Sequence, residues 1–186
     1  MSVQASDDRP IVVLGATGRT GRLTAGELVR LGRPLVLAAR RPERLRRLVE
    51  GGRGQITAVT ADARDADSLY SALRDAALLV NCAGPYGPIG SIPLRVALAR
   101  RVPYVDVSGE QAYVTSVAAL DGVAKEAGVP IFPGAGLFGG LAVVTAALAC
   151  QSLSAPSAVT ITHRLALVGA LGASLGTKRS AAWASG

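Results

Sequence analysis

Three glycines placed directly after a short apolar segment constrain the fold of this chain more than any other feature. The segment Ile11–Leu14 contains no polar residue, which is typical of a strand buried on both faces. Gly15, Gly18 and Gly21 follow it at three-residue spacing, and a helical pattern begins at Arg19. A strand, a glycine turn and a helix in this order open the α/β folds that bind dinucleotides.

The seven residues of this turn are predicted to hold the pyrophosphate of a dinucleotide. They are Gly15, Ala16, Thr17, Gly18, Arg19, Thr20 and Gly21. The first glycine permits a tight turn, the second lets backbone N–H groups approach the phosphates, and the third allows the helix to pack closely on the sheet. The unpaired N–H groups and the partial positive charge of the helix N-terminus favour an anion there. The alternative is a glycine-rich turn that binds no ligand.

Strand-like and helix-like segments alternate through the first 132 residues of the chain. Strands are expected at 11–14, 35–39, 55–60, 77–82, 102–107 and 129–132. Helices are expected at 19–31, 42–50, 68–74, from Pro93 onward and at 111–127, with glycine- and proline-rich loops at 84–90 and 134–140. This alternation predicts an α/β fold of the Rossmann type, with a doubly wound parallel sheet.

The organisation of the chain changes after residue 132. An apolar helix, expected to be buried, follows at 141–153, and a strand of alternating character is expected at 158–168. We therefore predict an N-terminal tail at 1–10, a dinucleotide-binding domain at 11–150 and the start of an incomplete second domain at 151–186. The apolar run 136–150 is shorter than the ~20 residues that a membrane span needs, so no integral span is expected.

The residue after the second predicted strand discriminates between the two nicotinamide dinucleotides. An acid at this position binds the ribose 2′-hydroxyl of NAD and would repel the 2′-phosphate of NADP. This chain has Arg40 there, followed by Arg41, and its next acid is Glu43. A guanidinium pairs with a phosphate through two hydrogen bonds. The sequence therefore predicts NADP (NADPH) as the cofactor, with Arg40 at the 2′-phosphate and Arg41 or Arg19 assisting.

Residues after the third and fourth strands complete the predicted site. Asp62 follows the third strand, where it either reaches the adenine edge or serves as a loop acid or helix cap. The loop residues expected beside the nicotinamide are Cys82, Ala83, Gly84 and Pro85. They leave the carboxyl end of the fourth strand, where ligands of such sheets bind. Tyr86 is open to two interpretations, a catalytic phenol and a packing residue.

The distribution of charge and the small number of metal-ligating residues argue against nucleic acid and metal as partners. The net charge is +7, from 18 Arg and 2 Lys against 13 acids, and eleven of the arginines lie within 9–53. No zinc finger or RNA-binding aromatic motif accompanies them, so nucleic acid is not expected. Arg44, Arg46 and Arg47 are expected on a solvated helix face. One histidine, His163, and two cysteines are too few for a zinc site built on these residues, so no metal is expected.

The sequence identifies no catalytic acid. The Tyr-x-x-x-Lys pair of short-chain dehydrogenases is absent, because neither Lys125 nor Lys178 lies four residues after a tyrosine. Residues 1–10 contain two acids and no apolar run, so they are not a signal peptide and a cytoplasmic location is expected.

Four segments of the chain carry a family resemblance. They are VVLGATGRTG at 12–21, LAAR at 37–40, NCAGPY at 81–86 and YVDVSGE at 104–110. Read together in this order, they resemble the NADP-binding domain of saccharopine dehydrogenase-like proteins, a group that includes the trans-acting enoyl reductases. The resemblance covers about residues 10–150.

The resemblance implies an NADP-dependent oxidoreductase. Hydride would pass between NADPH and a C=N, C=O or activated C=C bond of a small-molecule substrate, and a substrate or dimerisation domain, through which a homo-oligomer forms, would follow the cofactor domain. Asp106, Ser108 and Glu110 match a motif of the family, but the resemblance assigns them no role. The alternative is a non-catalytic NADP-binding or sensing module, or an inactive fragment. The missing Tyr/Lys pair and the short chain favour that alternative.

Overall fold

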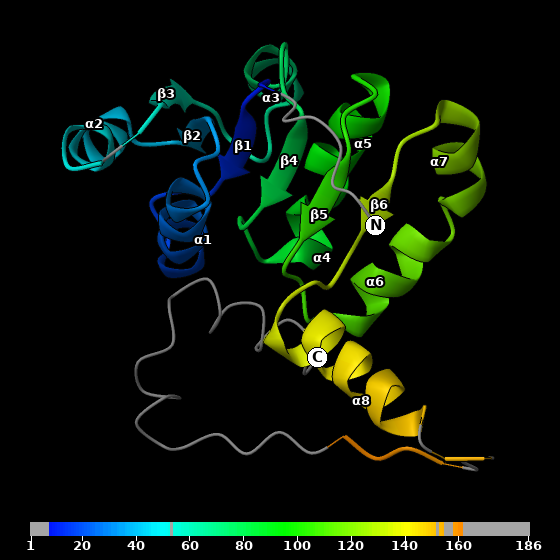
Figure 1. Ribbon diagram of the computed structural model, residues 1–186. Helices are drawn as coiled ribbons and strands as arrows, with labels where there is room; N and C mark the ends of the chain where they lie inside the picture. Colours follow the sequence, from blue (N-terminus) through cyan, green and yellow to red (C-terminus); the bar gives the residue numbers. More distant parts are fainter. Residues whose placement is uncertain (1–7, 53, 152, 155–157, 162–186) are drawn as a thin grey trace.

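A six-stranded parallel sheet forms the centre of the computed structural model, which describes residues 8–52, 54–151, 153–154 and 158–161 (Figure 1). Its strands are β1 (Ile11–Leu14), β2 (Leu35–Ala39), β3 (Ile56–Thr60), β4 (Leu78–Asn81), β5 (Tyr104–Asp106) and β6 (Ile131–Phe132). Their order is β3-β2-β1-β4-β5-β6, so the direction of winding reverses between β1 and β4. The predicted Rossmann-type fold is confirmed. Ligands of such sheets bind at the carboxyl ends of the strands, beside the reversal.

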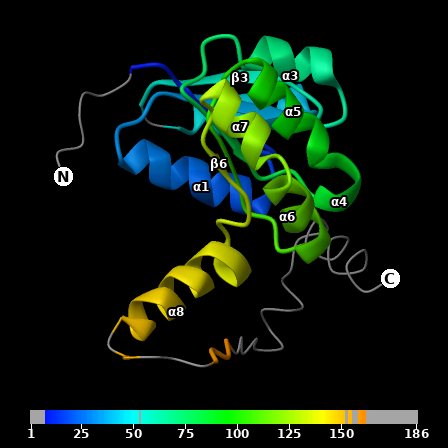
Figure 2. The same cartoon turned by 90° about the vertical axis from the view of Figure 1, so that its right-hand side faces the viewer.

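Helices cover both faces of the sheet. They are α1 (Arg19–Arg30), α2 (Pro42–Glu50), α3 (Ala66–Ala72), α4 (Tyr86–Ile89), α5 (Ser91–Ala99), α6 (Gln111–Ala118), α7 (Asp121–Ala127) and α8 (Ala142–Cys150). α1 and α2 pack on the face that contains Val13, and α3, α5 and α6 pack on the face that contains Val12. Figure 2 shows α1 on one side of the sheet and α3 and α5 on the other. β1 is therefore buried on both faces, which accounts for its wholly apolar sequence.

Some helices differ from their predicted bounds. The loop expected at 84–90 contains the short helix α4, and the helix expected at 111–127 is divided into α6 and α7. Asp121 opens α7, where the helix dipole favours an acid, and it pairs with Lys125 one turn later at 2.6 Å. α5 begins two residues before Pro93, because a proline in the first turn costs no helical hydrogen bond.

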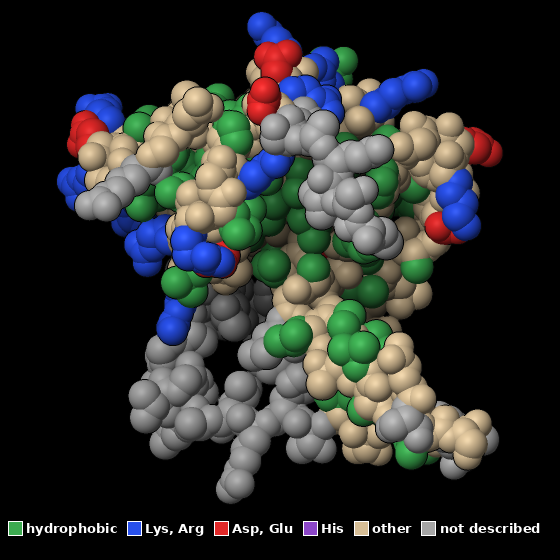
Figure 3. Space-filling model, viewed as in Figure 1, with side chains coloured by type: hydrophobic (Ala, Val, Ile, Leu, Met, Phe, Trp, Pro, Cys, Tyr) green, Lys and Arg blue, Asp and Glu red, His purple; other side chains and the backbone are tan. Residues whose placement is uncertain are grey.

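The apolar helix α8 extends away from the sheet (Figures 1 and 2). None of its residues is buried, and Val143, Val144 and Leu148 are exposed. Figure 3 shows apolar side chains on the surface of this helix. The expectation of a buried helix is therefore wrong for the described part of the chain. The reason is that, among the described elements, the main neighbour of α8 is the short π-helix η1 (Leu137–Leu141), which directly precedes it and occupies part of the loop expected at 134–140.

The remaining expectations concern the C-terminal part. No helix within the described ranges has the length and apolar character required to cross a membrane. Residues 158–161 do not form a strand, and the rest of the strand expected at 158–168 lies outside the described residues. The same holds for most of the second domain expected at 151–186.

Candidate dinucleotide-binding site

A cavity of about 600 Å³ lies at the carboxyl ends of β1, β2, β3 and β4. Most of the residues predicted for the site line it: Gly15, Thr17, Gly18, Arg19, Thr20, Arg40, Asp62, Cys82, Ala83, Gly84 and Pro85. Ala16 and Gly21, the remaining two, are buried and do not line the cavity. The parallel sheet thus brings together residues that are up to 70 positions apart in the sequence.

Main-chain contacts fix the glycine turn between β1 and α1. Gly15 has a left-handed backbone (φ 78°), and a Cβ atom there would lie 2.9 Å from the carbonyl carbon of Cys82. The N–H of Gly18 donates to the Gly15 carbonyl at 2.9 Å. A Cβ atom on Gly21 would lie 2.8 Å from the Cα of Ala16. Two of the glycines are therefore required by close packing of the main chain, while the outer side of the turn lines the cavity.

Five arginines line the cavity against a single acid, Asp62. The arginines are Arg19, Arg40, Arg41, Arg44 and Arg64. Arg40 and Arg41 follow β2 directly, and both are exposed. Arg44, which was expected on a solvated helix face, lines the cavity from the first turn of α2. Figure 3 shows basic side chains gathered over the side of the molecule where α1 and α2 lie. This excess of positive charge attracts an anionic ligand, and the guanidinium fork suits a phosphate.

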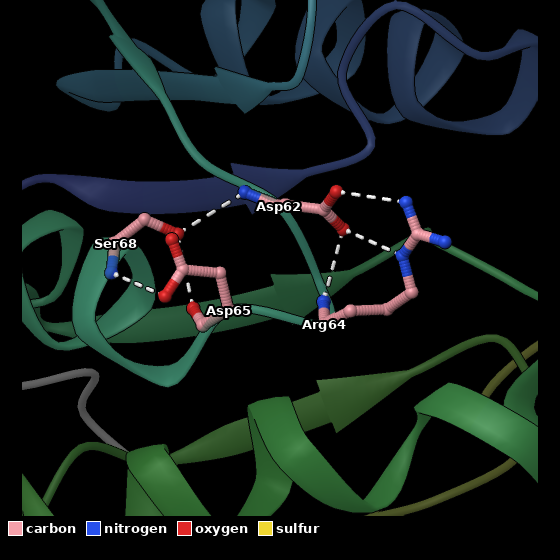
Figure 4. Close-up of polar contacts among 4 residues, drawn as sticks. All are labelled: Asp62, Arg64, Asp65 and Ser68. Atoms are coloured by element: carbon pink, nitrogen blue, oxygen red, sulfur yellow. Dashed lines mark hydrogen bonds and ion pairs between the residues drawn. The ribbon is translucent and has the colours of Figure 1, made fainter.

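Asp62 is held at the cavity wall by Arg64 (Figure 4). The guanidinium donates from Nη2 to Oδ2 at 3.1 Å and from Nε to Oδ1 at 3.3 Å, and the Arg64 backbone N–H donates to Oδ1 at 3.0 Å. The hydrogen bonds from the Arg64 side chain lower the pKa of Asp62. Its alternative role as a helix cap belongs to Asp65, whose carboxylate accepts the N–H groups of Asp67 at 3.1 Å and Ser68 at 3.4 Å.

The phenol of Tyr86 is a buried packing group. The residue is 5% exposed, and its hydroxyl donates to the Asn81 carbonyl at 2.8 Å. Its ring centroid lies 5.5 Å from that of Tyr113. Burial raises the pKa of this phenol. Of the two interpretations of Tyr86, its surroundings therefore support the packing role.

The sequence did not predict a chain of hydrogen bonds that runs through buried side chains and ends at the cavity. Nδ2 of Asn81 donates to the Tyr104 hydroxyl at 2.9 Å, and the hydroxyls of Tyr104 and Tyr113 lie 3.0 Å apart. Oδ1 of Asn81 accepts the N–H of Ala83 at 3.0 Å, so the chain ends on the loop that lines the cavity. The available signal was a tyrosine inside a predicted buried strand, because a buried phenol requires a hydrogen-bond partner.

We expect three of the four phenols to ionise only as the chain unfolds. Burial raises the pKa of Tyr86, Tyr104 and Tyr113 in the folded chain. The fold thus favours the neutral phenols. The free energy of unfolding therefore keeps its full value below the unfolded-chain pKa of about 10. Above that pH it falls by about 1.4 kcal/mol per phenol per pH unit. An alkaline titration that follows tyrosinate absorbance and circular dichroism tests this. Ionisation of two or more phenols before the dichroism changes would contradict it.

The wall beside Pro85 contains a neutral thiol. Burial raises the pKa of Cys82 to about 11, and its sulfur lies 3.9 Å from the hydroxyl oxygen of Thr24.

Asp106, Ser108 and Glu110 do not line the cavity but are buried. Within the described ranges, no group of three His, Cys, Asp or Glu side chains is placed to hold a metal ion, and the single histidine lies outside them.

The sheet order, the glycine turn and the arginine-lined cavity define a Rossmann-type dinucleotide-binding domain. The family model "Saccharopine dehydrogenase NADP binding domain" matches residues 11–132. The chain belongs to this family, whose cofactor is NADP.

Curated relatives carry the same resemblance over part of their length. A probable mitochondrial saccharopine dehydrogenase-like oxidoreductase of Arabidopsis thaliana is 30% identical over 118 residues, which are 56% of this chain and 26% of that protein. A lipid droplet localized protein of Caenorhabditis elegans is 30% identical over 138 residues, 68% of this chain and 32% of the relative. A human saccharopine dehydrogenase-like oxidoreductase is 27% identical over 59% of this chain and 30% of its own. The chain therefore spans about a third or less of the length of these relatives.

Solved structures share the fold at low sequence identity. Saccharopine dehydrogenase (L-Glu forming) from Saccharomyces cerevisiae superposes with a TM-score of 0.59 at 17% identity, covering 77% of this chain and 30% of that one. AtPrR2 with NADP+ and (+)pinoresinol gives a TM-score of 0.53 at 15% identity, covering 69% of this chain and 50% of the other. At these identities the likeness concerns the fold alone.

Proposed function

We propose that this chain is the cofactor domain of an NADP-dependent oxidoreductase acting on a small-molecule substrate. The observation that carries the proposal is the end of β2, where Arg40 and Arg41 stand in place of the acid of an NAD-binding domain. They lie in the same cavity as the glycine turn. The printed names of the Arabidopsis and human relatives, both saccharopine dehydrogenase-like oxidoreductases, support this class of reaction.

More residues can be assigned to the phosphate end of the cavity than to its other parts. The backbone N–H groups at the N-terminus of α1 bind the pyrophosphate, since Gly18 precedes them and offers no capping side chain. Arg40 pairs with the 2′-phosphate, and Arg41 and Arg19, which line the same cavity, assist it. The carboxylate of Asp62 lies at the adenine end of this arrangement.

The loop after β4 forms the nicotinamide end. Cys82, Ala83, Gly84 and Pro85 line the cavity there, and Ile89 adds an apolar side chain. When bound, NADPH supplies the hydride for reduction of a C=N, C=O or activated C=C bond. The contribution of this loop is to orient the ring and to exclude water from one side of it, because its lining groups are backbone, apolar side chains and a neutral thiol.

Location and assembly belong to the same proposal. A cytoplasmic location and a homo-oligomer formed through a second domain fit an oxidoreductase of this family, although the names of two relatives place those proteins in mitochondria and on lipid droplets. Fractionation of the source cells and light scattering of the purified chain test these two points.

Turnover separates the oxidoreductase from a non-catalytic NADP-binding module. The purified chain is incubated with NADPH and, in turn, a cyclic imine, a 2-oxo acid and an enone, and the nicotinamide absorbance is followed. We expect one of these substrate classes to consume NADPH faster than the no-enzyme control does. Saturable NADPH binding with no consumption in any of the three would contradict the reductase proposal and favour the binding module.

A further inference from the structure

We propose that Glu110 is a positioning residue for the nicotinamide end of the cavity, an inference that rests on the proposed function. Glu110 lies in the segment between β5 and α6 and does not line the cavity itself. Glu110 is 2% exposed, and its carboxylate accepts two backbone N–H groups. Oε1 accepts that of Tyr86 at 2.9 Å, and Oε2 accepts that of Gly87 at 2.5 Å.

These two bonds supply a helix cap from a distant part of the chain. α4 begins at Tyr86, and the residue before it, Pro85, has no side chain that can accept its first N–H groups. Glu110 itself stands at the N-cap position of α6, yet its side chain makes no capping bond to that helix. The carboxylate therefore caps α4 and not α6. Its two charge-assisted hydrogen bonds hold the backbone of α4 more firmly than neutral ones would.

The capped backbone continues directly into the cavity wall. Ala83, Gly84 and Pro85 line the cavity immediately before the two N–H groups that Glu110 binds. The other end of this wall is held by Oδ1 of Asn81, which accepts the Ala83 N–H at 3.0 Å. The wall is thus fixed at both ends by buried side chains. Without Glu110, one end would be released next to the proposed ring position.

Asp106 holds the backbone that leads from β5 toward Glu110. It is fully buried, and its Oδ1 accepts the Ser108 N–H at 3.0 Å, the Ser108 hydroxyl at 2.7 Å and the Gly134 N–H at 2.8 Å. These bonds fix the backbone between β5 and α6. The buried acids Asp106 and Glu110 therefore connect the loops after β4, β5 and β6, and Glu110 bonds the two residues that directly follow the cavity wall.

The test compares two ligands that differ only in the nicotinamide. The variants are Glu110→Gln and, as a matched control, Glu126→Gln, which changes an exposed residue of α7. For Glu110→Gln we expect NADPH to bind about 10-fold more weakly and 2′-phospho-ADP-ribose to bind within about 2-fold of the unmodified chain. The control should leave both affinities unchanged. Equal losses for the two ligands, or no loss for either, would overturn the positioning role.

Ligand binding by the unmodified chain and amide exchange also test the inference. An unmodified chain that binds 2′-phospho-ADP-ribose but gains nothing from the ring of NADPH would overturn the positioning role and leave the 2′-phosphate site standing. Failure to bind either ligand would overturn the proposed function itself. If Glu110→Gln does not fold, amide exchange in the unmodified chain replaces it. NADPH should then slow the amides of Tyr86 and Gly87 about 10-fold more than 2′-phospho-ADP-ribose does, and equal protection would overturn the inference.

Discussion

Replacing Gly21 by alanine should abolish NADPH binding at micromolar concentrations and destabilise the fold. A Cβ atom at this position would lie 2.8 Å from the Cα of Ala16 and would meet the carbonyl oxygen of Gly15 even more closely. Both contacts are with main chain, so the turn must move away from α1. We expect a loss of about 1–3 kcal/mol in the free energy of unfolding, the usual cost of overpacking. We also expect a loss of at least ~100-fold in NADPH affinity, equivalent to about 2.7 kcal/mol.

The same helix contains a matched control. Gly26 lies in α1 with nothing within 4 Å of a Cβ atom built on it. Gly26→Ala should therefore stabilise the chain by about 0.5–1 kcal/mol, because it reduces the freedom of the unfolded state, and should leave NADPH affinity unchanged. Chemical denaturation and calorimetric titration of both variants supply the measurements. Similar behaviour of Gly21→Ala and Gly26→Ala would show that the glycine turn has no part in binding.

Replacing Arg40 by alanine should remove the preference for NADPH. Arg40 lines the cavity directly after β2, where the 2′-phosphate is expected. Loss of a charge-assisted pair with a phosphate costs about 1.5–3 kcal/mol, which is roughly 10- to 150-fold in affinity for NADPH. NADH has no 2′-phosphate, so its affinity should change by less than about 2-fold. Titration of both cofactors with both proteins, at one ionic strength, measures the change.

Arg46→Ala controls for the loss of charge alone. Arg46 is exposed on α2 and does not line the cavity, whereas Arg40 does. Screening at physiological salt reduces the effect of charges farther than about 8 Å from the ligand. Arg46→Ala should accordingly retain most of the NADPH affinity. An equal loss in the two variants, or an equal loss of NADH binding in Arg40→Ala, would assign the effect to general charge and contradict a specific 2′-phosphate contact.

The strands and the glycine turn were predictable because their signals are local. A strand buried on both faces is apolar along its whole length, as β1 is, and the spacing of three glycines after it has a single structural meaning in that context. Arg40 and Arg41 line the same cavity as the glycine turn, because the parallel sheet brings every carboxyl end to one edge.

The features that the sequence did not reveal depend on distant partners. The cap of α4 comes from Glu110, 24 residues beyond the N–H group of Tyr86 that it accepts, and no local pattern marks it. The cap at Asp65 was missed for a different reason, because Asp62, Asp65 and Asp67 lie close together in the sequence and only Asp65 caps α3. The burial of α8 was mispredicted because an apolar sequence predicts burial only where another element covers it, and none of the elements in the described part of the chain does so.

The most direct test of the account is a calorimetric titration of the unmodified chain with NADPH and with NADH at one fixed salt concentration. The proposed pairing of Arg40 with the 2′-phosphate, together with the proposed phosphate turn at 15–21, predicts saturable binding of both cofactors. NADPH should bind at least about 10-fold more tightly, a difference of about 1.4 kcal/mol. Equal affinities, a preference for NADH, or no binding of either cofactor to the folded chain would contradict the central claim.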